Sequence, residues 1–399
     1  MKKTISIIGG GASALILGCE LNTKKYTVSI FEKNTALARK FLVAGDGGLN
    51  LTHSEDESKF ILRYTPYEFL ETAFKNFSNK DLIKWLNNTG LETFVGTSGR
   101  VFPKKGIKPI DVLNRLEEKI KSNSVKINFK HEWTGFSENN ELIFKTPTGN
   151  KQIQSDVVIF CLGGASWPVT GSKGDWLSFF KDKKIKTTPF EASNCSFKIN
   201  WPQELIKVIE GKPLKNISIK CGNKIHAGEI VLTSFGIEGS GIYPLSPQIR
   251  DELNKLGLAK IYIDLKPLSS SEEVLKKITN SRSKLSYTEN IVKQLNLNKT
   301  QIILLKSVMS KSDFLDPIKI VNNLKNLELL ISSLGPIEDA ISSVGGISLT
   351  EISEDFELKK LKNKFVIGEM LDYDAPTGGY LLQSCFSMGK YLADHLNDL

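Results

Sequence analysis

The feature that most constrains this chain is a strand–glycine-turn–helix–strand pattern at its amino end. An apolar run over Thr4–Ile8 predicts a short strand, and Gly9–Ala14 then reads Gly-Gly-Gly-Ala-Ser-Ala before apolar residues that predict a helix. A second predicted strand, Tyr26–Phe31, ends directly before Glu32. This is the order of elements in a βαβ unit that binds an adenine dinucleotide, with an acidic residue about 20 positions beyond the glycines.

Each part of this pattern has a physical role in holding a pyrophosphate. Gly9 permits the tight turn from strand to helix, and Gly11 lets the backbone approach the phosphates. The unpaired N–H groups and the positive dipole end of the helix face the negative charge. Ala14 still permits close packing of the helix on the strand, and Glu32 can accept hydrogen bonds from ribose hydroxyls. The pattern therefore predicts a dinucleotide site; a purely structural glycine turn is the alternative.

The composition is that of a globular protein without a membrane span. The chain has 399 residues, of which 40% are hydrophobic and 24% charged. No apolar run reaches the roughly 18 residues that a bilayer requires. The five cysteines form no C-x-x-C pair and the four histidines are scattered, so we predict no metal site and no disulfide relay. Reduced thiols of this kind are typical of a cytoplasmic protein.

The net charge of +9 raises the question of a nucleic-acid partner. Bidentate contacts to bases and phosphates favour arginine, and the lysines of this chain are spread along it rather than massed in one tract. We therefore interpret the charge as a solvated lysine-rich surface, and predict a small-molecule substrate rather than a nucleic acid. A nucleic-acid face is the alternative. The arginines among the 53 basic residues are Arg39, Arg63, Arg100, Arg115, Arg250 and Arg282.

Two styles of sequence alternate along the chain. Residues 1–189 and 340–399 contain short apolar strands that end in glycine, a predicted turn over Ser98–Pro103, and a final amphipathic helix that starts near Gly379. Residues 190–339 instead begin with irregular strands and continue with helices rich in Lys, Asn and Ser. We predict one α/β domain from the two outer segments. Residues 190–339 are inserted into it, as a β part over 190–268 and a helical part over 269–339.

Four separated segments carry a more specific signal, and their order and spacing span the chain. They are Gly9–Ala14 with Glu32 and Lys33, then Lys40–His53, then Gly163–Ser172, and finally Val344–Gly346 with Gly368–Asp372 and Gly378–Gln383. Together they resemble one family of flavoproteins, the BaiN-like and aminoacetone-oxidase-like FAD-dependent oxidoreductases. The resemblance implies FAD, and an α/β fold whose Rossmann-like FAD-binding domain is built from two segments, with an inserted β-barrel-like plus helical domain. Asp46, where a basic residue is expected, and Leu381, where many members have Asn, depart from the family pattern.

The fingerprint and the resemblance together imply the residues around the cofactor. Gly378 and Gly379 precede the last helix, whose N-terminus would stabilise the negative charge that builds on the flavin pyrimidine edge. His53, Trp167 and Tyr380 are the substrate-side candidates; a structural role for His53, a core position for Trp167 and a plain helix start for the glycines are the alternatives. The candidate cofactor-binding residues are Gly9, Gly11, Ala12, Ser13, Ala14, Glu32, Lys33, Lys40, Gly45, Asn50, Leu51, Gly163, Gly368, Glu369, Gly378, Gly379 and Leu381.

The sequence thus predicts an FAD-dependent oxidoreductase that acts on a small molecule by hydride transfer at flavin N5, with amine oxidation of the aminoacetone-oxidase type as one form. FAD is expected to bind non-covalently, because no His or Cys lies in a recognisable attachment motif. No second G-x-G-x-x-G follows a strand, so dioxygen or transiently bound NAD(P)H is the expected redox partner. The alternatives are an NAD(P)H-dependent reductase of C=C bonds, an FAD protein that modifies or binds tRNA, and a redox sensor without turnover. No acid–base pair stands out, so no catalytic residue is predicted, and the insert is expected to form the substrate-side wall.

Overall fold

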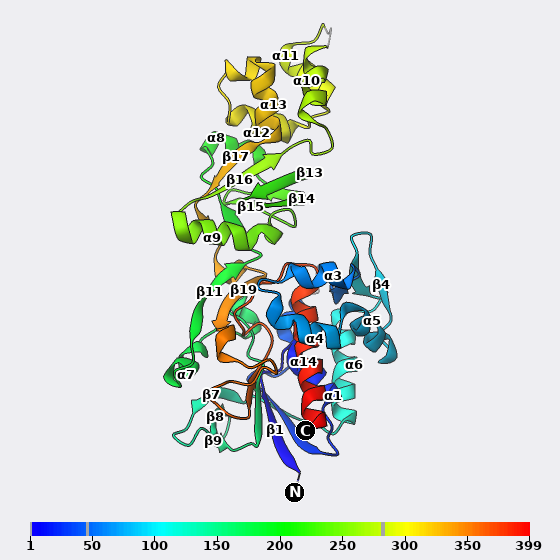
Figure 1. The fold of residues 1–399 in the computed structure, drawn as a ribbon, viewed down its shortest axis with the longest axis vertical. Helices are drawn as coiled ribbons and strands as arrows, with labels where there is room; N and C mark the ends of the chain where they lie inside the picture. Colours follow the sequence, from blue (N-terminus) through cyan, green and yellow to red (C-terminus); the bar gives the residue numbers. More distant parts are fainter. Residues whose placement is uncertain (1, 45–47, 281–283) are drawn as a thin grey trace. The chain divides into compact units, whose positions relative to one another are not determined.

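The computed structural model describes residues 2–44, 48–280 and 284–399. The chain divides into two compact units, which we treat separately: unit 1 comprises Met1–Ala192 and Ile341–Leu399, and unit 2 comprises Ser193–Ala340. Unit 1 contains both ends of the chain, which are blue and red in Figure 1.

A five-stranded parallel sheet organises unit 1, in the order β20–β10–β1–β2–β6. The central strand pairs Ile8 with Phe31 on one side and with Phe160 on the other. Parallel strands of one sheet end at the same edge, so the turns that follow β1, β2, β10 and β20 gather there. The strands are β1 (Lys3–Ile8), β2 (Tyr26–Glu32), β6 (Lys126–Phe129), β10 (Val157–Phe160) and β20 (Lys364–Val366).

Helices cover one face of this sheet. The helix α1 (Ala12–Glu20) is apolar almost throughout, and it packs between the sheet and α14 (Tyr380–Asp398). A Cβ on Gly389 of α14 would lie 2.4 Å from Cγ2 of Ile16, so only glycine allows this approach. The helix α6 (Pro109–Ser122) packs against α1 as well (Figure 1).

An antiparallel sheet covers the opposite face. In β2, Ile30 points towards Gly18 of α1, and the next side chain, Phe31, points to the other side because strand side chains alternate. There it stacks on Phe144, with ring centroids 4.6 Å apart. This second sheet has the order β7–β8–β9, with β7 (Glu132–Phe136), β8 (Leu142–Thr146) and β9 (Gly149–Ile153).

A third, small sheet lies within the chain between β2 and β6, in the order β3–β5–β4. Its strands are β3 (Thr52–His53), β4 (Thr93–Val95) and β5 (Arg100–Pro103). The residues from Arg100 onward therefore form a strand, where the sequence predicts only a turn. The neighbouring helices are α2 (Arg39–Ala44), α3 (Glu57–Phe60), α4 (Glu71–Asn76) and α5 (Asn79–Asn88).

Unit 2 contains a seven-stranded antiparallel sheet that nearly closes into a barrel. Its order is β17–β16–β13–β14–β15–β12–β18, and a single residue, Ser332, separates the two edge strands along the chain. The strands are β12 (Phe197–Lys198), β13 (Lys212–Cys221), β14 (Lys224–Leu232), β15 (Gly236–Glu238), β16 (Ala259–Asp264), β17 (Leu327–Ile331) and β18 (Ser333–Leu334). The predicted fold class, a Rossmann-like α/β domain with a barrel-like plus helical insert, is confirmed.

The helices of unit 2 begin at recognisable caps. Ser270, Ser286 and Asn298 each form a capping box with the third helical residue, which satisfies backbone donors at the helix start. These caps precede α10 (Ser271–Thr279), α11 (Tyr287–Leu295) and α12 (Lys299–Ser307), and α13 (Pro317–Lys325) follows. Two further helices, α8 (Gln203–Ile209) and α9 (Ser246–Leu256), lie among the strands.

The predicted helical part over 269–339 needs a correction at its end. Residues 327–331 form the strand β17, in which Leu327, Leu329 and Ile331 are buried while Glu328 and Leu330 are exposed. This alternation has a period of two and indicates a strand, but the helical composition of the preceding residues masked it.

Two short strands, β11 (Thr187–Ser193) and β19 (Ser342–Ile347), form a separate pair at the connections between the units. All five cysteines are buried thiols. In the parts of the chain that the structure describes, no helix is both long and apolar enough to cross a bilayer.

We expect Phe160→Ala to destabilise unit 1 by about 3–5 kcal/mol, because it removes a large side chain from a packed core. Phe160 is fully buried, with ring centroids 4.8 Å from Trp133 and 5.2 Å from Phe180. Urea denaturation followed by circular dichroism measures the change. Leu62→Ala is the control, because Leu62 is 61% exposed and its loss should change stability by less than about 0.5 kcal/mol. Equal midpoints for the two variants would contradict the proposed packing.

Candidate cofactor and substrate site

The turn after β1 forms a backbone cradle at the start of α1. Gly9 has φ +92°, and a Cβ on it would lie 2.5 Å from the carbonyl oxygen of Cys161. Gly11 is the N-cap of α1 and no side chain caps the helix, so the N–H groups that begin at Ala12 are left for a ligand. A Cβ on Gly11 would make an ordinary van der Waals contact, 3.8 Å from the carbonyl oxygen of Cys161. Ala14 is fully buried against the sheet.

Glu32 lies at the end of β2, directly beside this cradle. Its Oε2 accepts a hydrogen bond from the Gly10 N–H at 2.8 Å. Its Oε1 accepts from the backbone N–H of Asn34 at 2.8 Å and from Asn34 Nδ2 at 2.7 Å. A carboxylate has about four acceptor positions, so the buried Glu32 keeps capacity for a ribose hydroxyl. Lys33 is half-buried beside it.

Lys40 and Glu369 form an ion pair that joins three of the four segments of the family resemblance. Lys40 Nζ donates to the two carboxylate oxygens of Glu369 at 3.2 and 3.0 Å, and to Ser166 Oγ at 2.5 Å. The N–H of Ser343 donates to Glu369 Oε1 at 3.1 Å, and Ser343 Oγ accepts from the N–H of Ala165 at 2.9 Å. These residues come from four places in the sequence, so the cluster exists only in the folded unit.

Gly368 brings the end of β20 against the helices. A Cβ on it would lie 2.7 Å from Ser13 Oγ in α1 and 3.6 Å from Sγ of Cys385 in α14. Burial raises the pKa of Cys385 to about 11, although the hydrogen bond with Ser13 opposes this. The thiol is therefore neutral and unreactive at pH 7. Gly163, after β10, has φ +73° and lies beside Ser172.

The loop before β3 contains an unsatisfied acceptor. Asn50 Nδ2 donates to the carbonyl oxygen of Gly48 at 3.3 Å, but its buried Oδ1 has no partner among the described residues. Leu51 is fully buried and its N–H donates to the carbonyl oxygen of Val101 at 2.8 Å, which fixes the loop on β5. A buried carbonyl without a donor is costly, and a bound ligand would relieve that cost. Gly45 lies outside the described residues.

The start of α14 packs against β3. Gly379, the N-cap of α14, has φ +98°, and a Cβ on it would lie 2.6 Å from Cα of Thr52. Thr52 Oγ1 donates to Oε1 of the fully buried Gln383 at 2.7 Å, which holds the first turn in place. No side chain caps α14, so the N–H groups of its first turn are available to a ligand, and so is the N–H of Gly378. Leu381 is half-buried against the core.

His53 and Tyr380 belong to a hydrogen-bonded cluster beside this helix start. Tyr380 Oη donates to Glu55, and Arg63 binds both oxygens of Glu55 at 3.1 and 2.8 Å. Burial would raise the pKa of Glu55, but the hydrogen bonds from Arg63 and Tyr380 outweigh it and lower this pKa. Burial raises the pKa of Tyr380 well above its usual value, and the bond to Glu55 adds to the effect. The phenol is therefore neutral and the carboxylate ionised.

His53 uses both ring nitrogens within the protein. Its Nδ1 accepts from the Glu55 N–H at 3.1 Å, so Nε2 carries the proton and donates to the carbonyl oxygen of Ser98 at 3.0 Å. The ring stacks on Tyr380 with centroids 5.5 Å apart. In this state His53 positions the cluster and has no nitrogen left for acid–base work.

Trp167 lies in the loop after β10, in a strained backbone conformation. It is only half-buried, and its φ of +53° and ψ of +59° are in the left-handed region, which is rare for a bulky side chain. Strain of this kind is concentrated at functional sites. A simple core position, the alternative that we considered, does not fit these observations.

Arg100 belongs to no motif of the sequence, and the structure places it at the start of α14. A Cβ on Gly378 would lie 3.3 Å from Nε of Arg100. The guanidinium is half-buried and has no hydrogen bond or ion pair to any described residue. The available sequence signal was that arginine is scarce in this lysine-rich chain, but the contact itself joins residues that are 278 positions apart.

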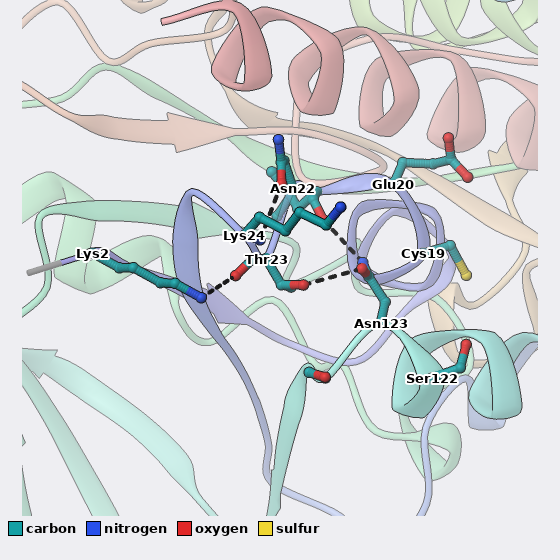
Figure 2. A pocket seen from close by; sticks show the side chains of 10 residues that line it. Lys2, Cys19, Glu20, Asn22, Thr23, Lys24, Ser122 and Asn123 are labelled. Atoms are coloured by element: carbon teal, nitrogen blue, oxygen red, sulfur yellow. Dashed lines mark hydrogen bonds between the residues drawn. The ribbon is translucent and has the colours of Figure 1, made fainter.

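An open pocket lies at the other end of α1 and has a volume of about 630 Å³ (Figure 2). There Asn123 Nδ2 donates to the carbonyl oxygens of Gly18 and Leu21, both at 2.9 Å, and so satisfies the last carbonyls of the helix. The carboxyl end of a helix disfavours anions, so this pocket does not suit a dinucleotide. Its lining residues are Lys2, Cys19, Glu20, Leu21, Asn22, Thr23, Lys24, Ser122, Asn123 and Ser124.

The residues at the edge of the sheet fit a dinucleotide on three observations. The glycine cradle opens onto an uncapped helix, Asn50 Oδ1 has no donor among the described residues, and a second uncapped helix, α14, starts directly after Gly378 and Gly379. A fold of this type with such a site defines a dinucleotide-binding protein.

Comparison with known proteins agrees with that class. The family model described as "HI0933-like protein Rossmann domain" matches residues 3–395. The chain is 23% identical to "Ribosomal RNA dihydrouridine synthase" of Haemophilus influenzae over 96% of this chain and 95% of the relative. It is also 23% identical to "3-dehydro-bile acid delta(4,6)-reductase" of Clostridium scindens, over 98% and 97%. Among solved structures, 3-ketosteroid delta1-dehydrogenase from Sterolibacterium denitrificans matches with a TM-score of 0.50 and 12% identity, over 100% of both chains, which shows the fold alone.

The chain therefore belongs to the HI0933-like Rossmann-domain family. It is an FAD-dependent oxidoreductase, and the predicted resemblance to BaiN-like FAD enzymes is confirmed. One sequence prediction is weakened: we favoured a small molecule over a nucleic acid, yet one of these two relatives is named for a ribosomal RNA substrate.

We expect Glu32→Ala to weaken FAD binding by roughly 1.5–3 kcal/mol, about tenfold or more, because charged hydrogen bonds to the ribose are lost. Titration of the apoprotein with FAD measures the dissociation constant. Glu71→Ala is the matched control, because the Glu71 side chain is 46% exposed and pairs with Lys75 on its own helix. An unchanged affinity in Glu32→Ala would mean that this acid does not contact the cofactor.

We expect Gly379→Ala to lower the flavin reduction potential by about 20–40 mV, because the added Cβ meets Thr52 and displaces the start of α14. Spectroscopic titration against a reference dye measures the potential. Gly106→Ala controls for backbone strain, since Gly106 also has φ +98° but has no atom within 4 Å of its Cβ position. Identical potentials in both variants would show that α14 does not act on the flavin.

Proposed function

We propose that this chain reduces a C=C bond conjugated to a carbonyl group, and that the substrate is uridine within RNA. The observation that carries the proposal is that two relatives, each aligned over more than nine-tenths of both chains, are named for adding hydrogen to such a bond. Dihydrouridine is uridine with its ring C=C saturated, and a 3-dehydro bile acid with delta(4,6) double bonds is a conjugated ketone. The chemistry is thus common to both, although the substrates differ.

The charge of the chain allows RNA as a substrate but does not choose between RNA and a small molecule, because the lysines are spread along the chain. The net charge is +9, and RNA is a polyanion whose binding is driven largely by phosphate contacts with Lys and Arg. The small-molecule substrate that the sequence analysis favoured, a conjugated ketone such as the bile acid of the second relative, is the second candidate.

When bound, FAD would supply a hydride to one carbon of the double bond, and a proton from solvent would add to the other carbon. The residues of the chain would hold it non-covalently: the Gly9–Ala14 cradle at the pyrophosphate, Glu32 at the ribose, and the Lys40–Glu369 pair with Asn50 farther along the cofactor. Gly378, Gly379 and the first turn of α14 would face the flavin with N–H groups, which favour a negative charge on the reduced ring.

Arg100 would stabilise negative charge on the substrate. As hydride adds to the carbon β to a carbonyl, negative charge moves to the carbonyl oxygen, and a guanidinium within hydrogen-bond reach favours that state.

We also propose NAD(P)H as the electron donor and a cytoplasmic location, and keep amine oxidation of the aminoacetone-oxidase type as the competing reaction.

Anaerobic half-reactions test the proposal. The FAD-loaded protein is reduced by NADPH and mixed with an unmodified ribosomal RNA transcript, and flavin reoxidation is followed together with the mass of the digested nucleosides. We expect reoxidation, and uridine that gains the mass of two hydrogen atoms. A transcript made with dihydrouridine in place of uridine is the control and should not reoxidise the flavin.

Two parallel reactions decide against the alternatives. The reduced protein is mixed with a delta(4,6)-3-keto bile acid, and the oxidised protein with aminoacetone. Reoxidation by the bile acid and not by RNA would favour the small-molecule reductase. Reduction by aminoacetone, with no reaction of the reduced protein towards RNA or ketone, would overturn C=C reduction in favour of amine oxidation.

A further inference from the structure

The face of the small β3–β5–β4 sheet carries an unusual set of side chains. Arg100 and Phe102 alternate along β5 and therefore share one face, and the ladder pairs them with His53 of β3 and Phe94 of β4. We call these four residues the β5 face. The opposite face bears Val101 and Thr52, both fully buried, and Val95, which is 55% exposed.

Both ends of the β5 face touch glycine-containing segments that adjoin the proposed cofactor site. At one end, Arg100 lies against Gly378, as described above. At the other, a Cβ on Gly48 would lie 3.3 Å from Cε1 of Phe102. The β5 face therefore spans the distance between the start of α14 and the loop that precedes Asn50. When these two segments hold the flavin, the β5 face lies next to the substrate carbon that reacts with it.

The chemistry of the β5 face suits a flat ring that carries a carbonyl oxygen. Phe94 and Phe102 stack with centroids 5.5 Å apart and an interplanar angle of 23°, and Phe94 is 45% exposed. Such an aromatic surface stacks on a nucleobase, which has a planar π-face. Arg100, which has no partner among the described residues, offers a fork of N–H donors to a carbonyl or phosphate oxygen.

We propose that the β5 face binds the uracil ring of the RNA substrate, with Phe102 stacked on the base and Arg100 bound to its carbonyl oxygen. This inference rests on the proposed function and names the residues that would recognise the substrate. His53 takes part only as a support, because both of its nitrogens are engaged. The chain has a net positive charge and the RNA backbone is negative, so the two attract each other.

Binding without turnover tests this inference. The oxidised holoprotein is titrated with a short oligouridylate while the flavin absorption spectrum is recorded. We expect a saturable spectral change in the wild type, and at least tenfold weaker binding in Arg100→Met and in Phe102→Ala. Phe102→Tyr keeps the aromatic ring and should bind within about twofold of wild type, which separates loss of stacking from loss of fold.

Matched substitutions and a cofactor measurement serve as controls. Arg115→Met removes an exposed arginine that pairs with Glu118 on α6, and Ile110→Ala removes an exposed apolar side chain of the same helix. Both should bind oligouridylate as the wild type does. FAD dissociation constants of all variants should agree within about twofold, because the β5 face is assigned to the substrate and not to the cofactor.

Three outcomes would overturn the inference. If the wild type reduces uridine in RNA but all variants bind oligouridylate equally, the β5 face is not the base site while the proposed function stands. If Arg100→Met loses FAD and keeps oligouridylate binding, Arg100 belongs to the cofactor. If the wild type neither binds oligouridylate nor reduces uridine, the proposed function fails as well.

Discussion

The architecture of unit 1 depends on how closely α1 approaches its neighbours. At its amino end, Gly9 lies so near the carbonyl of Cys161 that a Cβ would be 2.5 Å from the oxygen, and along its side Gly389 of α14 meets Ile16 at 2.4 Å. These contacts join the beginning of the chain to β10 and to its last helix. Because a methyl group would disrupt either one, the cofactor cradle and the packing of both chain ends depend on the same small residues.

The electrostatics of the site follow from this packing. Two helices, α1 and α14, begin without a side-chain cap at the same region of unit 1, and each presents N–H groups and a positive dipole end. Lys40 is neutralised by Glu369, whereas Arg100 keeps its charge free of described partners. We propose that the positive helix ends face the negatively charged cofactor and that the Arg100 guanidinium faces a substrate oxygen. The Glu55–Arg63 ion pair has a structural role, because Glu55 accepts the hydrogen bond from Tyr380 Oη and so holds this side chain in place.

Much of the fold could be predicted because its signals are local. The βαβ unit is marked by an apolar strand, three glycines and an apolar helix within a few residues. Each element depends on contacts between residues that are close in the sequence. The sequence likewise predicts a final helix that starts near Gly379. In the structure this helix, α14, starts at Tyr380. The strand β17 was missed because its alternation occupies only five residues beside a long helical stretch, and a short pattern is outweighed by its surroundings.

The candidate site was predictable to a lesser degree. The glycine cradle and Glu32 lie next to one another in the sequence pattern, so their grouping follows from the βαβ unit alone. The Lys40–Glu369 pair and the contact of Arg100 with Gly378 join residues that are hundreds of positions apart. A family resemblance pointed to Lys40 and Glu369, but the residues alone could not pair them.

The sequence by itself determined the dinucleotide-binding unit, because the glycines, the helix and the acid act through backbone geometry over about 30 residues. It determined equally that the two outer segments differ in character from the lysine-rich middle. Only the tertiary structure decided that Arg100 meets the start of α14 and that Phe102 meets Gly48. Those contacts arise where a three-stranded sheet, a loop and the last helix pack together, and side-chain packing between distant segments leaves no periodic trace in the sequence.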